Sequence, residues 1–201
     1  FFTINKKGSW ITNQFSRGRV HLLRSNHDCI VTSSKTVLKD NPLLTCRIKG
    51  LENRSPTRII LDNNLKIPIN SNIFKESSKY RTIVFYNKAN NKRIKFLKKL
   101  RVELFRIPLN LNGNLDLTQC LIKAKELGFY RIFLECGFVL ASNFLRQNLV
   151  DELKIFVSCK SLGKNGKNNA KRQLEQFLKN NKGVTSRVNL FGDKLITYKV
   201  K

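Results

Sequence analysis

Short apolar runs bounded by polar turn residues alternate with amphipathic segments along this chain. Apolar runs rich in Ile, Val and Phe are typical of buried strands, whereas apolar residues at i, i+3 and i+4 are typical of helices. The predicted strands are residues 28–32, 58–62, 81–86, 102–107, 130–135 and 153–159, and the predicted helices are residues 12–25, 35–39, 92–100, 116–127 and one that begins at Gly137. This alternation predicts an α/β fold with a mostly parallel central sheet flanked by helices.

The C-terminal part of the chain shows a different pattern. Residues 160–182 are polar and rich in Lys and Asn, so we expect the least order there. Strand-like runs at 186–191 and 194–200 flank Gly192-Asp193, which predicts a C-terminal antiparallel hairpin at the edge of the sheet. The chain shows no internal repeat and no domain boundary, so we expect residues 1–201 to form one domain.

Residues 28–47, DCIVTSSKTVLKDNPLLTCR, give the strongest indication of a ligand site. The hydroxyl residues 32–34 follow a buried strand and can cap the short helix after it. Asp-Asn-Pro at 40–42 ends that helix, because the residue before a proline is disfavoured in the helical conformation. Hydroxyls, Asp40 and Arg47 therefore gather where a strand ends, and ligands bind there in open α/β sheets.

The turn at Gly137 is a second candidate site. A strand that ends in Glu135 leads through Cys136 and Gly137 into a helix, whose free N–H groups and dipole attract a phosphate. Glycine lets a ligand approach the backbone, although many such turns contain a glycine for packing alone. Glu135 can bond a ligand hydroxyl or amine, or simply pair with a lysine.

Four further candidates each have a purely structural alternative. Arg24 and Arg47 are suited to clamp a phosphate, or they are two of the 39 Lys and Arg residues in solvent. His21, in the first predicted helix, is more typical of a satisfied histidine than of a catalytic base. Trp10, the one tryptophan of the chain, is either a core anchor or a cover over a ligand.

The formal net charge of +26 is extreme for 201 residues. A nucleic acid or another polyanion is one explanation of such a charge. The basic residues are dispersed, in 95–99, 160–172 and 179–182, and Lys, Asn, Ile and Phe all have AT-rich codons. We therefore favour compositional drift over a nucleic-acid footprint.

The five cysteines are widely separated and form no CxxC pair, which argues against a zinc site, and we expect no metal. Most have apolar neighbours, which favours free thiols in a reducing compartment such as the cytoplasm. No apolar run approaches the ~20 residues of a membrane span. The chain begins with Phe1 and contains no Met, so we expect it to be a fragment or a processed product.

Several segments together resemble one protein family. They are GSWIT at 8–12, Arg24-Ser25, TSSKTVLKDNPLLTCR at 32–47, RIILD at 58–62, LECGFVLASNFLRQNLVDEL at 134–153, Leu162-Gly163 and LFGDKLITYKV at 190–200. Their order and spacing resemble the riboflavin-biosynthesis reductases, in particular the C-terminal reductase domain of bifunctional RibD. The resemblance implies a dihydrofolate-reductase-like fold, a homodimer, and NADPH-dependent reduction of 5-amino-6-(5-phosphoribosylamino)uracil to its ribitylamino product.

The resemblance also implies roles for individual residues. Cofactor contacts are expected at Trp10, Thr36, Asp40, Asn63, Gly137, Phe138, Val139, Leu140 and Ala141, the last five within a pyrophosphate-binding stretch. Substrate contacts are expected at Gly8, Arg24, Leu44, Arg47 and Glu135, with the two arginines on the ribose phosphate. Glu135 and Asp40 are the candidate catalytic residues.

This sequence departs from the family pattern in three ways. The family's opening strand, with its Ala-Ser-x-Asp-Gly run, is expected to precede residue 1. Cys136 and Phe138 replace the usual small residues of the turn at Gly137. The HxE and PCxxC motifs of the zinc deaminase domain are not in this sequence. Two alternatives to an active reductase therefore stay open, namely a basic nucleic-acid-binding protein and a truncated, inactive relative.

Overall fold

The computed structural model describes residues 2–4, 10–160, 166–168 and 172–200. The chain divides into two compact units, one made of Phe1–Val20 and Phe138–Lys201, the other of His21–Gly137. The boundaries fall inside helix α1 (Gln14–Ser25) and directly before helix α6 (Phe138–Arg146). No helix in the described part of the chain is long and apolar enough to span a membrane.

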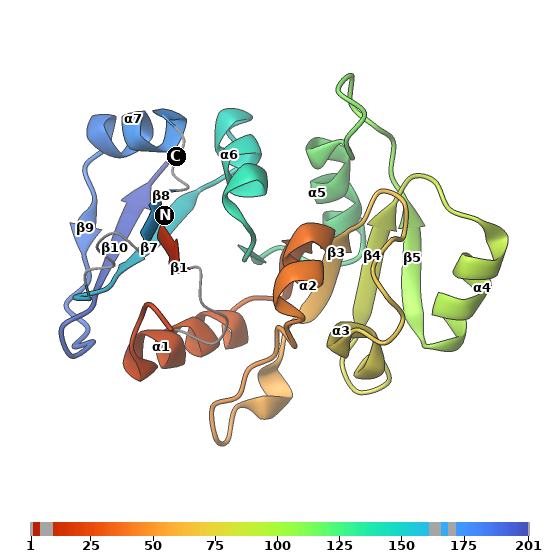
Figure 1. The fold of residues 1–201 in the computed structure, drawn as a ribbon, viewed down its shortest axis with the longest axis horizontal. Helices are drawn as coiled ribbons and strands as arrows, with labels where there is room; N and C mark the ends of the chain where they lie inside the picture. The colour runs from red at the N-terminus through yellow and green to blue at the C-terminus, as the bar shows by residue number, and fades with distance from the viewer. Residues whose placement is uncertain (1, 5–9, 161–165, 169–171, 201) are drawn as a thin grey trace. The chain divides into compact units, whose positions relative to one another are not determined.

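A five-stranded parallel sheet forms the centre of the unit His21–Gly137 (Figure 1). Its strand order is β5–β4–β3–β2–β6, and each neighbouring pair is parallel. The strands are β2 (Cys29–Ser33), β3 (Thr57–Leu61), β4 (Thr82–Tyr86), β5 (Val102–Arg106) and β6 (Ile132–Leu134). The predicted α/β fold with a parallel central sheet is confirmed, and all five strands end at the same edge.

Helices cover this sheet and complete its core. They are α2 (Ser34–Asp40), α3 (Asn72–Lys75), α4 (Asn91–Lys99) and α5 (Leu117–Glu126), with a short 3-10 turn at Glu52–Arg54. One core cluster joins Val37 of α2, Phe74 of α3 and Leu97 of α4 to Ile60 and Val84 of the sheet. Helix α5 begins as predicted, because the Asp116 carboxylate accepts a hydrogen bond from Gln119 N.

The other unit contains a separate antiparallel sheet of order β7–β10–β9. Its strands are β7 (Glu152–Val157), β9 (Val184–Thr185) and β10 (Lys194–Lys199), and a second antiparallel pair joins β1 (Phe2–Ile4) to β8 (Gly166–Asn168). The predicted C-terminal antiparallel hairpin is present, but its first strand is Val184–Thr185 and not residues 186–191, and it forms a sheet with β7 and does not extend the parallel sheet. Ser186 and Asn189 accept hydrogen bonds from the backbone two residues on, and such local bonds compete with a strand ladder.

Residues 160–182 contain an element that the sequence analysis did not predict. Helix α7 (Arg172–Asn180) lies there, and the Phe177 ring is 6.2 Å from the Tyr198 ring, centroid to centroid. Leu174, Phe177 and Leu178 have helical spacing, which the many lysines and asparagines around them obscured. Residues 161–165 and 169–171 lie outside the described residues, so the expectation of least order for this segment stays a prediction, and only the helix itself was missed.

Asp193 ties the turn before β10 to the start of α1. Its carboxylate accepts hydrogen bonds from Asn13 N (2.9 Å), Ser16 Oγ (2.7 Å) and Cys159 N (3.2 Å). Burial alone would raise the pKa of Asp193, but these donors outweigh it and the pKa is lowered. Asn13, not the predicted Thr12, caps α1, since its Oδ1 accepts a hydrogen bond from Ser16 N.

Arg58 is an arginine at the centre of the parallel sheet, and it is fully buried. Its guanidinium donates to Thr82 Oγ1 and to the carbonyl oxygens of Leu43, Ile73 and Tyr80. Burial lowers the pKa of Arg58 to about 10. One cation thus satisfies carbonyls from helix α3 and from two loops near the strand β3.

We predict that Arg58→Met lowers the free energy of unfolding by roughly 2–4 kcal/mol, because each buried carbonyl left without a partner costs roughly 1–3 kcal/mol. Urea denaturation measures this change. The matched control is Arg54→Met, which removes an exposed arginine and should change stability by less than about 0.5 kcal/mol. Equal stability of the two variants would contradict the structural role of Arg58.

Candidate functional site

The candidate site lies at the carboxyl ends of β2 and β6, which are neighbours in the sheet. Strand β2 leads into α2 through Ser33, and β6 leads through Glu135 to Gly137. Glu135 N donates a hydrogen bond to Val31 O at 3.0 Å, so the strand pairing continues to the residue whose side chain reaches the site. The parallel sheet therefore brings the two candidate motifs of the sequence together.

Hydroxyl groups connect the start of α2 to the Gly137 turn. Ser33 Oγ accepts a hydrogen bond from Thr36 N at 3.3 Å and lies 3.1 Å from Thr36 Oγ1. Thr36 Oγ1 in turn accepts a hydrogen bond from Gly137 N at 3.3 Å. Thr36 and Gly137, both expected at the cofactor, are thus direct neighbours.

Packing gives no reason for a glycine at position 137. A Cβ there would meet no described atom within 4 Å apart from its chain neighbours, and the residue does not have a positive φ. The alternative that this glycine serves packing alone therefore loses support, while close approach of a ligand to the backbone remains as an explanation.

Arg24 and Glu135 form an ion pair with two hydrogen bonds at this edge of the sheet. Arg24 Nε lies 2.9 Å from Glu135 Oε2, and Arg24 Nη2 lies 2.7 Å from Glu135 Oε1. Arg24 Nη1 donates to Thr45 O at 2.9 Å. The Arg24 side chain is only 9% exposed, whereas that of Glu135 is 33% exposed. A ligand can therefore reach Glu135, while the guanidinium of Arg24 is occupied.

His21 lies one helical turn before Arg24 on α1 and connects this helix to Thr45 and Arg47 as well. Its Nδ1 lies 3.0 Å from Thr45 O and 3.3 Å from Arg47 N. Burial and the positive charges of Arg24 and Arg47 lower the pKa of His21 below its ordinary value of 6.5, although the hydrogen bond to Thr45 O and the charge of Glu135 act to raise it. We refer to His21, Arg24, Thr45, Arg47 and Glu135 together as the Arg24 network.

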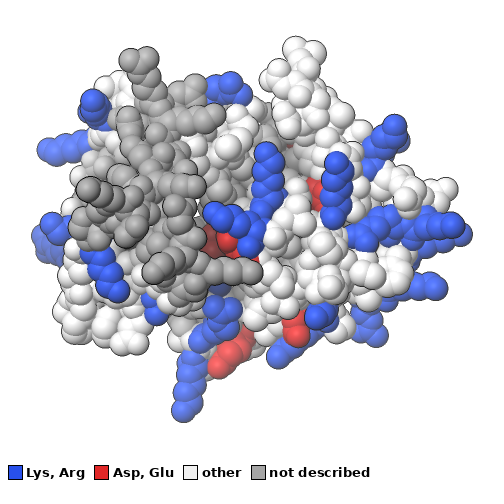
Figure 2. Space-filling view, viewed as in Figure 1, with Lys and Arg blue, Asp and Glu red and all other residues white. Residues whose placement is uncertain are grey.

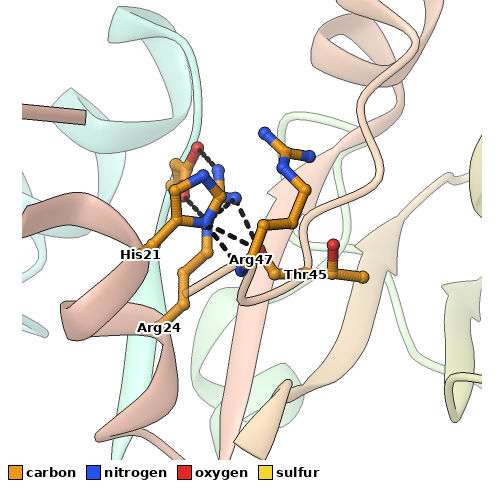
Figure 3. Close-up of polar contacts among 5 residues, drawn as sticks. His21, Arg24, Thr45 and Arg47 are labelled. Carbon is orange, nitrogen blue, oxygen red and sulfur yellow. Dashed lines mark hydrogen bonds and ion pairs between the residues drawn. The ribbon is translucent and has the colours of Figure 1, made fainter. Parts of the chain in front are cut away.

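Arg47 is the exposed cation of the Arg24 network. Its backbone is held by His21, while its guanidinium extends away from the hydrogen-bonded groups (Figure 3). Among the described residues that guanidinium has no hydrogen bond or ion pair. Both arginines were expected to bind a phosphate. In the structure Arg24 is paired with Glu135, whereas the guanidinium of Arg47 can still bind a phosphate.

Three other predicted site residues of this unit lie outside the Arg24 network. Asp40 is exposed at the end of α2. Asn63 Nδ2 donates to Gly113 O at 3.2 Å, and its Oδ1 is buried without a partner among the described residues. Leu44 is 2% exposed and belongs to the core, with a left-handed φ of 57°. The Leu44 side chain therefore offers almost no surface to a ligand.

The remaining predicted cofactor residues belong to the other unit. Trp10 is 66% exposed, so it is not a core anchor, and the Arg17 guanidinium lies 4.7 Å from its ring centroid. Residues 138–141, Phe138, Val139, Leu140 and Ala141, form the first turn of α6, as predicted for the helix after Gly137. Gly8 lies outside the described residues.

The sequence analysis missed one contributor to the site. Ser33 caps α2, as predicted for the hydroxyls at 32–34, whereas Thr45 contributes through its backbone oxygen, which leaves no signature in the sequence. The spacing of His21 and Arg24 was informative, because residues i and i+3 share a helix face and can contact the same partner. That partner is Thr45 O for both side chains.

With this geometry established, comparison with known proteins identifies the family. The model of the family described as RibD C-terminal domain matches residues 2–189. This chain belongs to the RibD C-terminal domain family. The riboflavin biosynthesis protein RibD of Aquifex aeolicus is 33% identical over 161 residues, 80% of this chain and 43% of that protein. RibD of Chlamydia trachomatis is 30% identical over 168 residues, covering 82% of this chain and 44% of that protein. The chain thus spans less than half the length of these RibD relatives.

Solved structures show the same fold. Acinetobacter baumannii RibD has a TM-score of 0.72 at 22% identity, over 96% of this chain and 52% of that one. A Thermotoga maritima protein described as a diaminohydroxyphosphoribosylaminopyrimidine deaminase/5-amino-6-(5-phosphoribosylamino)uracil reductase has a TM-score of 0.67 at 24% identity, over 96% and 50% of the two chains. The predicted dihydrofolate-reductase-like fold of this RibD C-terminal domain is confirmed.

We predict that Glu135→Gln lowers the pKa of His21 further below 6.5, because the carboxylate is the charged group that raises this pKa, in addition to the hydrogen bond to Thr45 O. Imidazole resonances followed by NMR across the acidic range measure this pKa. Glu103→Gln is the control, since it removes the same charge from an exposed ion pair with Arg81. A His21 pKa that rises in Glu135→Gln, or shifts equally in the control, would contradict the described network.

Proposed function

We propose that this chain is an NADPH-dependent reductase of riboflavin biosynthesis that converts 5-amino-6-(5-phosphoribosylamino)uracil to its ribitylamino product. The observation that carries the proposal is the family match over residues 2–189, together with a partly exposed Glu135 and an Arg47 guanidinium that has no ion pair among the described residues. RibD relatives and a uracil reductase structure support the same reaction. A phosphorylated sugar joined to a polar ring needs a cation for one end and a hydrogen-bond acceptor for the other.

Arg47 is proposed to bind the ribose phosphate. Its guanidinium can donate two parallel hydrogen bonds to phosphate oxygens, and it loses no existing ion pair among the described residues when it does so. Arg24 has a different part in this proposal from the one that the sequence suggested. Its two bonds hold the Glu135 carboxylate in one orientation, so it acts on the substrate through Glu135.

Glu135 is proposed to contact the ribose or the amino group of the substrate. Each carboxylate oxygen accepts one bond from Arg24 and retains a lone pair for a second donor. A carboxylate fixed in this way can orient the sugar carbon that is reduced, and orientation is the main contribution a protein makes to a cofactor reaction. The catalytic role of Asp40 stays a prediction.

Cofactor contacts are proposed for each unit by itself. In the unit His21–Gly137 these are Thr36, Asp40, Asn63 and Gly137. Asn63 Oδ1, which has no partner among the described residues, suits a hydrogen-bond donor of the ligand, and the open space beside Gly137 suits a pyrophosphate. For the other unit, taken by itself, the proposed contacts are Trp10, Phe138, Val139, Leu140 and Ala141, the last four in the first turn of α6, where the helix dipole suits a phosphate. When bound, NADPH would supply the hydride for the reduction of the ribose at C1′.

Binding of a polyanion is the second candidate function. On the face drawn in Figure 2, lysines and arginines are dispersed, with a dense group over α4. That helix carries Lys92, Arg93, Lys95, Lys98 and Lys99 and no acidic residue. Polyanion binding predicts an affinity for RNA that falls steeply with salt and is indifferent to NADPH. Saturable NADPH oxidation that requires the uracil substrate would favour the reductase instead.

We predict that Arg47→Ala raises the KM for the phosphoribosylaminouracil substrate about 10- to 100-fold with a smaller change in kcat. Loss of a charge-assisted bond is worth roughly 1.5–3 kcal/mol, and about 1.4 kcal/mol corresponds to a factor of ten. Loss of NADPH absorbance at several substrate concentrations gives both constants.

Arg54→Ala is the matched control for this variant, because it removes an exposed arginine that lies outside the Arg24 network. Its KM should equal that of the unmodified chain. If Arg47→Ala and Arg54→Ala had the same KM, Arg47 would not be the phosphate ligand.

A further inference from the structure

His21 lies between the two arginines of the site and contacts the backbone that carries one of them. Its Nδ1 is 3.0 Å from Thr45 O, 3.3 Å from Arg47 N and 3.4 Å from Arg24 Nη1. One nitrogen atom therefore faces one acceptor, Thr45 O, and two donors. The proposed reaction assigns this histidine no role.

The two tautomers of neutral His21 make different bonds. With the proton on Nε2, Nδ1 is an acceptor and takes the N–H of Arg47. With the proton on Nδ1, the ring donates to Thr45 O instead and the Arg47 N–H loses its acceptor. A doubly protonated ring can only donate, so it holds Thr45 but not Arg47.

We propose that His21 is a positioning residue, whose neutral imidazole fixes the backbone of Arg47 so that the guanidinium is presented to the substrate phosphate. The inference rests on the proposed function, because it names what sets the geometry of the phosphate ligand. His21 itself does not reach the substrate. It acts through the backbone bond to Arg47, in parallel with the bond that Arg24 makes to Thr45 O.

Protonation of His21 should weaken this arrangement. The charged groups that face the ring are Arg24 on the same helix, Arg47 on the segment packed against it, and Glu135 after β6. The two cations and burial oppose protonation, so the ring stays neutral at pH 7 and takes up its proton only below 6.5. The folded state thus binds fewer protons than the unfolded state as the pH falls below 6.5, and folding stability falls with it.

Two substitutions separate positioning from mere folding. The side-chain amide of Asn puts a donor or an acceptor where His21 has Nδ1, and it does not titrate. The amide of Gln reaches the place of Nε2 and so misses Arg47 N. His21→Asn should therefore keep the hydrogen bond to Arg47 N. His21→Gln should lose this bond, although the Asn and Gln side chains are similarly polar.

The first experiment needs no turnover, so it stands even if the proposed reaction fails. We expect the amide resonance of Arg47 to titrate with the His21 ring in the unmodified chain and to be independent of pH in His21→Asn. We expect His21→Gln to weaken binding of ribose 5-phosphate, the probe, about 2- to 10-fold at pH 7.5, and His21→Asn to leave it unchanged. Arg47→Ala should abolish the difference between the two variants.

The pH dependence of KM gives the second readout. The second pKa of a phosphate monoester lies near 6, so the KM of every variant should change with pH as the substrate phosphate ionises. The unmodified chain should show an additional rise in KM below pH 6.5 that His21→Asn lacks, with kcat similar in both. An Arg47 amide that ignores the His21 titration, or equal ribose 5-phosphate affinity in both variants, would overturn the proposal. If ribose 5-phosphate binds as expected but no NADPH is oxidised, the proposed reaction fails while the role of His21 stands.

Discussion

The ion pair between Arg24 and Glu135 is the interaction on which the geometry of the site depends. It joins residues 111 positions apart, one on a helix and one at the end of a strand, through two bonds of 2.9 and 2.7 Å. Such a pair costs desolvation energy, so it is weak evidence for stability. Its effect is to fix the orientation of a carboxylate that a ligand can reach, and to hold Thr45 O through the remaining nitrogen.

Parallel pairing explains why these residues meet at all. Strands β2 and β6 are neighbours although a hundred residues separate them, and both end at the same edge. The hydroxyls after β2 therefore contact Gly137, and the carboxylate after β6 contacts helix α1. The free Arg47 and the accessible Glu135 give this edge a cation and an acceptor, which suit a sugar phosphate linked to a polar ring.

Much of this could be predicted from the sequence, because strand runs, helix caps and the Gly137 turn are local patterns. The hydrogen-bond and ion-pair partners of the charged residues could not be predicted from the sequence. Arg24 and Arg47 are both cations in family motifs, and only the fold shows that Arg24 is the one paired with Glu135. Leu44 belongs to the same motif, yet its side chain lies in the core, because burial depends on packing between distant elements. Helix α7 was missed because charged and polar residues surround its short apolar pattern.

The central claim is that this RibD C-terminal domain catalyses hydride transfer to the sugar of its substrate. Incubation with NADPH deuterated at C4 of the nicotinamide, followed by mass spectrometry of the product, tests it directly. The account predicts a ribitylamino product that carries one deuterium, formed only when both compounds are present. Substrate that remains unreduced and unlabelled in the presence of the folded chain would contradict it.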